Sequence, residues 1–171
     1  MGGGAASRRG AEMMRSPDAL MALVRGIDVV NNFAFLPHRR AFANAKGGWD
    51  ATPVLTACNL YVNVCTAALG RPIPPKKANE QVAWLKSERG MLAGWMPVDG
   101  ETARQRAESG YPTVAATTNP AGHGHIALVV PADASGAPGI YVSSAGATNH
   151  VRCVLHRSFG VAAMPEYWTN S

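Results

Sequence analysis

The sequence has few cysteines, few charged residues and no long hydrophobic run, and each shortage excludes a class of protein. Three cysteines among 171 residues are an odd number, which argues against a disulfide framework. No two of them show the Cys-x-x-Cys spacing of a zinc site, nor does a Cys/His pattern supply one. Charged residues make up 16% of the chain and hydrophobic residues 47%, so the chain is neither disordered nor a coiled coil.

Segments that would carry the chain into or through a membrane are also missing. No stretch approaches the roughly 18 consecutive apolar residues of a membrane span. The short apolar stretch of residues 19–24 is soon interrupted by Arg25 and Asp28, which does not fit a cleavable secretory signal. We therefore expect a protein that either stays in the cytosol or leaves by a route that does not read such a signal.

The length fits one domain with a sizeable buried core. We expect a flexible basic leader over residues 1–16 and a single domain over residues 17–171. The 16 Lys and Arg against 11 Asp and Glu give a net charge of +5, a mild bias toward acidic partners such as nucleic acid, anionic lipid headgroups or bacterial cell wall. A nucleic-acid partner is not predicted, because the aromatic residues do not interleave with Lys and Arg.

Hydrophobic periodicity changes along the chain from helical to strand-like. Ser16 is a candidate N-cap with Pro17 at the first helical position, and helical patterns also occupy residues 58–69, 79–87 and 100–110. Alternating or continuous apolar runs predict strands at residues 111–116, 125–131 and 139–143, followed by a last strand that contains Tyr167 and Trp168. Helices first and an antiparallel meander afterwards predict the α+β class.

Cys58 is the first candidate for chemistry, because it lies where a helix is expected to begin. Backbone N–H groups and the positive end of the helix dipole would favour a thiolate there, and the same N–H groups could hold an oxyanion. The alternative is a structural thiol, since cysteine outside disulfides is among the most buried residue types. Cys65 is better explained as core, and Cys153 would need His150 and His156 beside it to bind a metal.

His125 is the second candidate, in the segment Gly122-His123-Gly124-His125 that precedes the apolar run 126–130. A histidine that opens a buried strand, after glycines that leave room for a ligand, is well placed as a general base. His123 and His125 would lie on the same face of a strand, so a metal pair is the rival interpretation, although no third ligand has a suitable spacing.

Together these residues resemble the papain-like cell-wall amidases, the superfamily of the NlpC and CHAP hydrolases and of the amidase effectors of type VI secretion. The resemblance covers residues 30–171. It rests on Cys58-Asn59 at a helix head, the Ala-rich helix that leads into residues 111–116, the Gly-His-Ile-Ala strand at 124–127, the segment 144–149 and the aromatic ending 165–168. It implies a papain-like core in which the nucleophile helix packs on an antiparallel sheet, with Cys58 as nucleophile, His125 as base, and no metal or cofactor.

The family usually has a third polar residue on the next strand, where it orients the imidazole. Here that strand supplies Ser143 and Ser144 in place of Glu, Asn, His or Gln, and Asn149 lies just beyond. The third catalytic member therefore stays open between Ser144 and Asn149.

Substrate-binding residues can be proposed around this pair. Asn59 follows the nucleophile, where related sequences more often use it to support the helix head. His123 and three aromatic residues are the other candidates for the groove, with core burial as the alternative for the aromatic ones: Trp49, Tyr61 and Trp95.

The resemblance implies a monomeric cysteine hydrolase that cleaves amide bonds in peptidoglycan stem peptides, either a secreted antibacterial effector or a phage lysin. Its expected partners are peptidoglycan and a cognate immunity protein, without nucleic acid or membrane insertion. Two alternatives stay open. One is a papain-like peptidase, deamidase or acyltransferase that acts on a protein or lipid, and the other is a non-catalytic binding module of the same fold.

Overall fold

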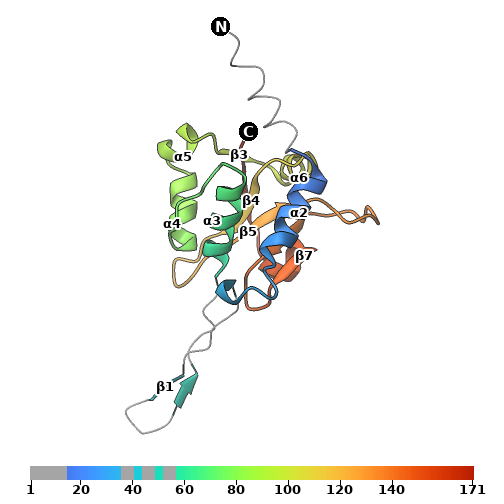
Figure 1. Ribbon diagram of the computed structural model, residues 1–171. Coiled ribbons are helices and arrows are strands. Elements are labelled where there is room, and N and C mark those ends of the chain that lie inside the picture. Colours follow the sequence, from blue (N-terminus) through green and yellow to red (C-terminus); the bar gives the residue numbers. More distant parts are fainter. Residues whose placement is uncertain (1–14, 36–40, 44–48, 52–56) are drawn as a thin grey trace.

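A computed structural model describes residues 15–35, 41–43, 49–51 and 57–171 of the chain. Within these ranges the chain places helices on both faces of a six-stranded antiparallel sheet (Figure 1). The α+β class expected from the sequence is therefore confirmed. Residues 1–14 of the leader expected over residues 1–16 lie outside the described residues.

The sheet has the order β3-β8-β4-β5-β6-β7, and each neighbouring pair is antiparallel. Strands β4 to β7 follow one another as a meander, whereas β8 returns from the C-terminal region to lie between β3 and β4. The bounds are β3 Met96–Val98, β4 Thr113–Thr117, β5 His125–Val130, β6 Tyr141–Ser144, β7 His150–Val154 and β8 Glu166–Thr169. Two further strands, β1 (Ala41–Ala43) and β2 (Trp49–Ala51), pair only with each other in the described part of the chain.

One face of the sheet carries the helix that begins at Cys58. This helix, α3 (Cys58–Ala68), packs on β5, with α2 (Pro17–Ile27) beside it and α4 (Ala78–Leu85) over β4. Figure 1 shows the three helices side by side in front of the sheet. Their core contains the residues of β5 that point to this face, Ile126, Leu128 and Val130, together with Tyr61 and further side chains of α3.

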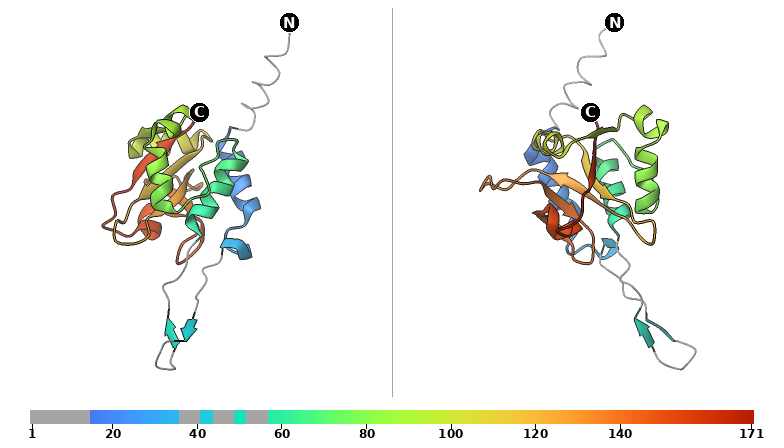
Figure 2. Two further views of the ribbon diagram at one scale, coloured as in Figure 1. Left: turned by 90° about the vertical axis from the view of Figure 1, so that its left-hand side faces the viewer. Right: turned by 180° about the vertical axis from the view of Figure 1, so that it is seen from behind.

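The opposite face carries α6 (Gly100–Glu108) and the short α7 (Leu155–Phe159). Figure 2 shows these two helices in front of the sheet in its right-hand view. Because side chains alternate along a strand, Ala127 and Val129 of β5 point to this side. They pack there with Ala107 of α6 and Phe159 of α7.

The helix ends follow local sequence signals. The hydroxyl of Ser16 accepts a hydrogen bond from the backbone N–H of Ala19 at 3.0 Å, with Pro17 at the start of α2, so the predicted N-cap is confirmed. Gly110 ends the turn after α6 with φ +78°, and a Cβ atom there would lie 2.5 Å from the backbone nitrogen of Ser16. Two short helices, η1 (Phe33–Phe35) and α5 (Glu88–Leu92), complete the described fold. None of the helices in these ranges has the length and hydropathy to cross a bilayer.

Candidate active site

Cys58 is the first residue of α3, as expected, and its side chain is 3% exposed. Ala57, at the N-cap position, makes no side-chain cap hydrogen bond, and the N–H groups of a first helical turn are able to interact with an anion. All three cysteines of the chain are thiols. The thiol at the helix start is thus placed where backbone N–H groups can stabilise a negative charge.

The first turn of α3 is held in place from the loop before α4 and from α4 itself. Asn59 donates through Nδ2 to the carbonyl of Lys76 at 2.9 Å. Gln81, which is fully buried, donates through Nε2 to the carbonyls of Asn59 at 3.1 Å and Pro74 at 3.0 Å. Asn59 therefore has the supporting role at the helix head, and its part in substrate binding stays a prediction.

Asn149 acts as a clamp between two loops. Its Oδ1 accepts from the backbone N–H of Gly146 at 3.1 Å, and its Nδ2 donates to the carbonyls of Val29 and Phe35, both at 2.8 Å. These bonds engage both polar atoms of the side chain with backbone groups. Asn149 is therefore a structural residue in this fold, and its expected role as the third catalytic member is not supported by its contacts.

The clamp brings the predicted nucleophile and the predicted base to the same end of the molecule. A Cβ atom on Gly146 would lie 3.7 Å from Cε1 of His125, the first residue of β5. On the other side of the clamp, the ring of Phe35 packs edge-on against Tyr61, with 5.3 Å between the ring centroids. Because Tyr61 lies one turn after Cys58, the start of α3 and the start of β5 share one end of the sheet.

His125 is held from the side of α7. Its Nε2 lies 2.8 Å from the hydroxyl of Ser158, and this hydroxyl donates in turn to Ser144 Oγ at 2.9 Å. The ring of Phe159 packs against the imidazole with 4.7 Å between centroids. The hydroxyl in contact with the imidazole is therefore that of Ser158, with Ser144 behind it, and the orienting role expected of Ser144 stays a prediction.

Sequence reasoning missed Ser158, because it lies 33 residues from His125 and belongs to a short helix that the hydrophobic pattern did not predict. No local spacing could have signalled this contact.

Burial lowers the pKa of His125 to about 4, from an ordinary value of 6.5. The cause is desolvation, which disfavours the charged imidazolium. At neutral pH the side chain is therefore a neutral imidazole, which is the form that accepts a proton as a general base.

The two predicted catalytic residues approach this end from different faces of the sheet. Cys58 belongs to the core under α3, together with Ile126 and Leu128. By the alternation along β5, His125 points to the side of Ala127, where its contacts with α7 lie. A direct pairing of the Cys58 thiol with the imidazole stays a prediction.

The residues proposed for a substrate groove are not gathered around this end. Tyr61 is fully buried, and its hydroxyl lies 2.6 Å from that of Ser143, while burial raises its pKa above the usual range. Trp95 is also fully buried, so the groove assignment was wrong for both aromatic residues, which fill the core instead. His123 is exposed in the loop before β5. Trp49 belongs to β2, and its side chain lies outside the described residues.

Cys153 lies in the core of the α6 and α7 face and is 8% exposed. Burial raises its pKa, which disfavours a reactive thiolate. Within the described ranges, no three potential metal ligands among His, Cys, Asp and Glu come together. In the described part of the chain, the stretch from His150 to His156 therefore belongs to no such group.

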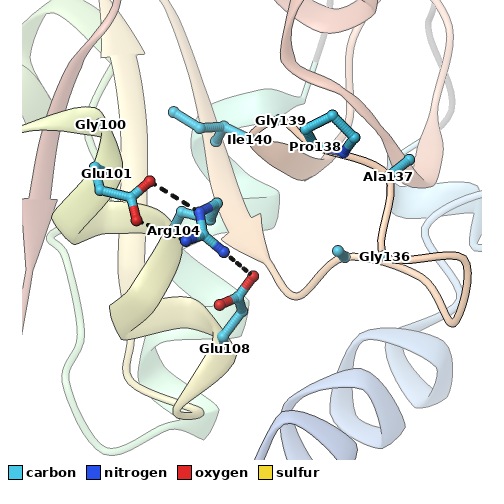
Figure 3. A pocket seen from close by; sticks show the side chains of 10 residues that line it. Gly100, Glu101, Arg104, Glu108, Gly136, Ala137, Pro138, Gly139 and Ile140 are labelled. Carbon is cyan, nitrogen blue, oxygen red and sulfur yellow. Dashed lines mark hydrogen bonds and ion pairs between the residues drawn. The ribbon is translucent and has the colours of Figure 1, made fainter.

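Two surface cavities lie away from this end of the sheet. One, of about 560 Å³, lies between α6 and the loop 136–140 (Figure 3). Arg104 on its floor forms ion pairs with Glu101 at 2.6 Å and Glu108 at 2.5 Å. The other, of about 620 Å³, lies between α2 and the end of α3. Neither cavity is lined by the predicted nucleophile or base.

In comparisons with known proteins, no protein-family model and no curated protein matches the chain.

Proposed function

We propose that the chain is a cysteine hydrolase that cleaves amide bonds in the stem peptides of bacterial peptidoglycan. The observation that supports the proposal is that two element starts lie toward the same end of the sheet, on opposite faces of it. Cys58 opens α3 and His125 opens β5, and the imidazole is anchored through Nε2 by Ser158. A thiol at a helix N-terminus and an anchored neutral imidazole are the two groups that thiol-dependent amide hydrolysis requires.

In the proposed reaction His125 accepts the thiol proton of Cys58 on Nδ1, and the resulting thiolate attacks the amide carbonyl carbon. The N–H groups of the first turn of α3 stabilise the tetrahedral oxyanion. The imidazolium then gives its Nδ1 proton to the amine as the C–N bond breaks, which leaves a thioester on Cys58. Water attacks the thioester while Nδ1 takes one of its protons, and the departing thiolate regains that proton.

These reaction steps require the sulfur of Cys58 and Nδ1 of His125 to come within hydrogen-bond distance of each other. Catalytic hydrogen bonds are often long or poorly aligned before substrate binds and tighten in the complex. The side chain of Cys58 is 3% exposed, so entry of the substrate has to open a path to the sulfur. We assign this adjustment to the loop between β4 and β5, which precedes His125 in the sequence.

The substrate class comes from the resemblance to the cell-wall amidases, and the net charge of +5 is compatible with the carboxylates of stem peptides. Delivery into a target periplasm as an antibacterial effector, with a cognate inhibitor protein in the producing cell, belongs to the same proposal. A phage lysin is the alternative route to the same substrate.

The test is digestion of purified peptidoglycan by the full chain, with mass spectrometry of the released fragments. We expect new peptide ends with the wild type and none with Cys58→Ala or His125→Ala. Cys65→Ala is the matched control, because Cys65 is a fully buried thiol two turns further along α3, and it should keep cleavage if it folds. Circular dichroism establishes folding for each variant. Unchanged peptidoglycan with folded wild type, or full cleavage by Cys58→Ala, would refute the proposal.

A further inference from the structure

The cavity of about 620 Å³ between α2 and the C-terminal end of α3 has no part in the proposed function. We call it the α2–α3 cavity. Because Cys58 begins α3, the cavity lies about 15 Å further along the helix axis, at a rise of about 1.5 Å per residue. Its size is within the range of about 300–1,000 Å³ that is usual for small-molecule sites. It is therefore a separate candidate site, and its lining determines what it can bind.

The lining of the α2–α3 cavity is mostly apolar, and its side chains are short. Six of them come from α2, the end of α3 and the residue before β4: Ala19, Ala22, Leu23, Ala68, Leu69 and Pro112. None of the six is among the large hydrophobic side chains that protrude from the described surface, such as Val161 and Met164. A recessed apolar surface of this kind can enclose the apolar chain of a small ligand, whereas contact with a bilayer requires side chains that protrude.

Three arginines gather beside this cavity. Arg15 and Arg71 line it. Arg71 donates through Nε to the backbone oxygen of Ser171 at 2.7 Å, and Arg106 donates through Nη2 to the hydroxyl of the same residue at 3.2 Å. Arg15 and Arg106 also lie over the same ring, that of Tyr111, at 5.3 and 3.4 Å from its centroid. These contacts concentrate three positive charges at one side of the cavity.

The positive charges at the α2–α3 cavity have no acidic side chain to balance them. Among the described residues, the cations in ion pairs with Asp or Glu are Lys86 and Arg104 instead. Arg15 makes no hydrogen bond within those residues, and Arg71 uses Nε and Nη1 but not Nη2. Both arginines that line the cavity therefore keep N–H donors for a ligand, and the guanidinium group fits the two oxygens of a carboxylate.

The end of α3 at the cavity favours a ligand with a single negative charge. The negative end of the helix dipole lies there, and Arg71 already donates through Nη1 to the carbonyl of Gly70 at 3.3 Å. These oxygens offset part of the positive charge, so a carboxylate is a better match than a phosphate monoester with its charge of about −2.

We propose that the α2–α3 cavity binds a small amphipathic carboxylate, with the apolar chain between the two helices and the carboxylate on Arg15 and Arg71. The site does not depend on the proposed function, because neither Cys58 nor His125 lines the cavity. Its occupant is a free small molecule, and the apolar lining together with the two arginines determines its class.

The test is calorimetric titration of the full chain with decanoate at pH 7, below the micelle concentration of decanoate. We expect saturable binding of one molecule per chain. Two probes separate the contributions of head and chain: decyltrimethylammonium has a similar chain with a positive head, and acetate has the carboxylate without the chain. Neither should bind under the same conditions. No saturable binding of decanoate, or equal binding of decyltrimethylammonium, would overturn the proposal.

Variants test the two parts of the site separately. Arg15→Gln removes a cation that makes no hydrogen bond to the described residues, so the fold should be retained. It should weaken decanoate binding about tenfold, the effect of one charge-assisted hydrogen bond. Ala22→Phe introduces a ring into the cavity from an exposed position of α2 and should abolish binding. Wild-type affinity in either variant, with folding established by circular dichroism, would overturn the assignment.

Arg89→Gln is the matched control for Arg15→Gln. Arg89 is an exposed arginine of α5 that does not line the cavity, and its replacement lowers the net charge by the same amount. This variant should bind decanoate with the wild-type affinity. An equal loss of affinity in both arginine variants would show a general attraction of anions to the basic chain and would overturn the proposal.

Two further measurements establish the place and the source of the ligand. In amide NMR spectra, decanoate should shift the signals of Gly70 and Gly110, which line the α2–α3 cavity, and leave those of Gly136 and Gly139 in the other cavity unchanged. A shift in the second pair alone would overturn the location. In sedimentation with phosphatidylglycerol vesicles, the chain should stay in solution. Binding to vesicles without binding of free decanoate would make the bilayer the partner and would refute a small-molecule site.

Discussion

Protonation of His125 should destabilise the folded protein, and the size of this effect can be calculated from its burial. The folded state holds the pKa of this imidazole at about 4, against an ordinary value of 6.5, because desolvation disfavours the charge. Between these two values the unfolded chain binds a proton that the folded protein does not bind. Stability is therefore complete above pH 6.5 and is lost as the pH falls toward 4.

The magnitude follows from 1.36 kcal/mol for each pH unit between the two values. The linkage relation gives a loss of about 2 kcal/mol at pH 5 and about 3 kcal/mol at pH 4, relative to pH 7. This is a large part of the 5–15 kcal/mol that typically stabilises a domain. The measurement is urea unfolding at pH 7, 6, 5 and 4, followed by tryptophan fluorescence.

The comparison with His125→Gln isolates the contribution of this residue, because the other titrating groups are common to both proteins. The variant should lose about 2 kcal/mol less than the wild type between pH 7 and pH 5. His156→Gln, which removes an exposed histidine of the neighbouring α7, is the control and should keep the wild-type dependence. Parallel curves for the wild type and His125→Gln would refute the burial of a neutral imidazole at this position.

Two further predictions concern the scaffold. Asn149→Ala removes the hydrogen bonds to Gly146 and to the carbonyls of Val29 and Phe35. We expect the free energy of unfolding, measured in urea, to fall by about 2–3 kcal/mol and the amide of Gly146 to exchange faster. An unchanged exchange rate at Gly146 would contradict the bridging role of Asn149. Gly110→Ala places a Cβ atom on a residue in the left-handed conformation, against the backbone of Ser16, the N-cap of α2. We expect a melting temperature lower by several degrees, whereas an equal or higher one would contradict the strain at this turn.

Much of the fold could be predicted from hydrophobic periodicity. The helices that begin at Pro17 and Cys58 and the strand that begins at His125 lie where the pattern places them. Strand β3 could not be predicted, because three residues with Pro97 in the middle carry no alternation. Strand β7 was missed because its half-buried edge position allows polar residues such as Arg152.

The candidate site could be predicted only in part, because hydrophobic periodicity locates the helices and strands but not the contacts between distant segments. Cys58 and His125 open elements that local signals identify, so their places in the fold follow from the pattern. Ser158 reaches the imidazole only because β7 leads the chain back along the sheet into α7, and such a contact depends on the whole fold. Tyr61 and Trp95 were assigned to a groove because aromatic side chains suit both binding surfaces and cores, and burial distinguishes the two only in the folded protein.

The place of β8 between β3 and β4 determines when the protein can complete its fold during synthesis. The meander of β4 to β7 can form as soon as it leaves the ribosome, but β3 has no partner other than β8 in the described sheet. The edge of β4 also stays uncovered until β8, residues Glu166–Thr169, has been made. Native structure is therefore acquired late, and a nascent chain that stops short of β8 would expose two strand edges to aggregation.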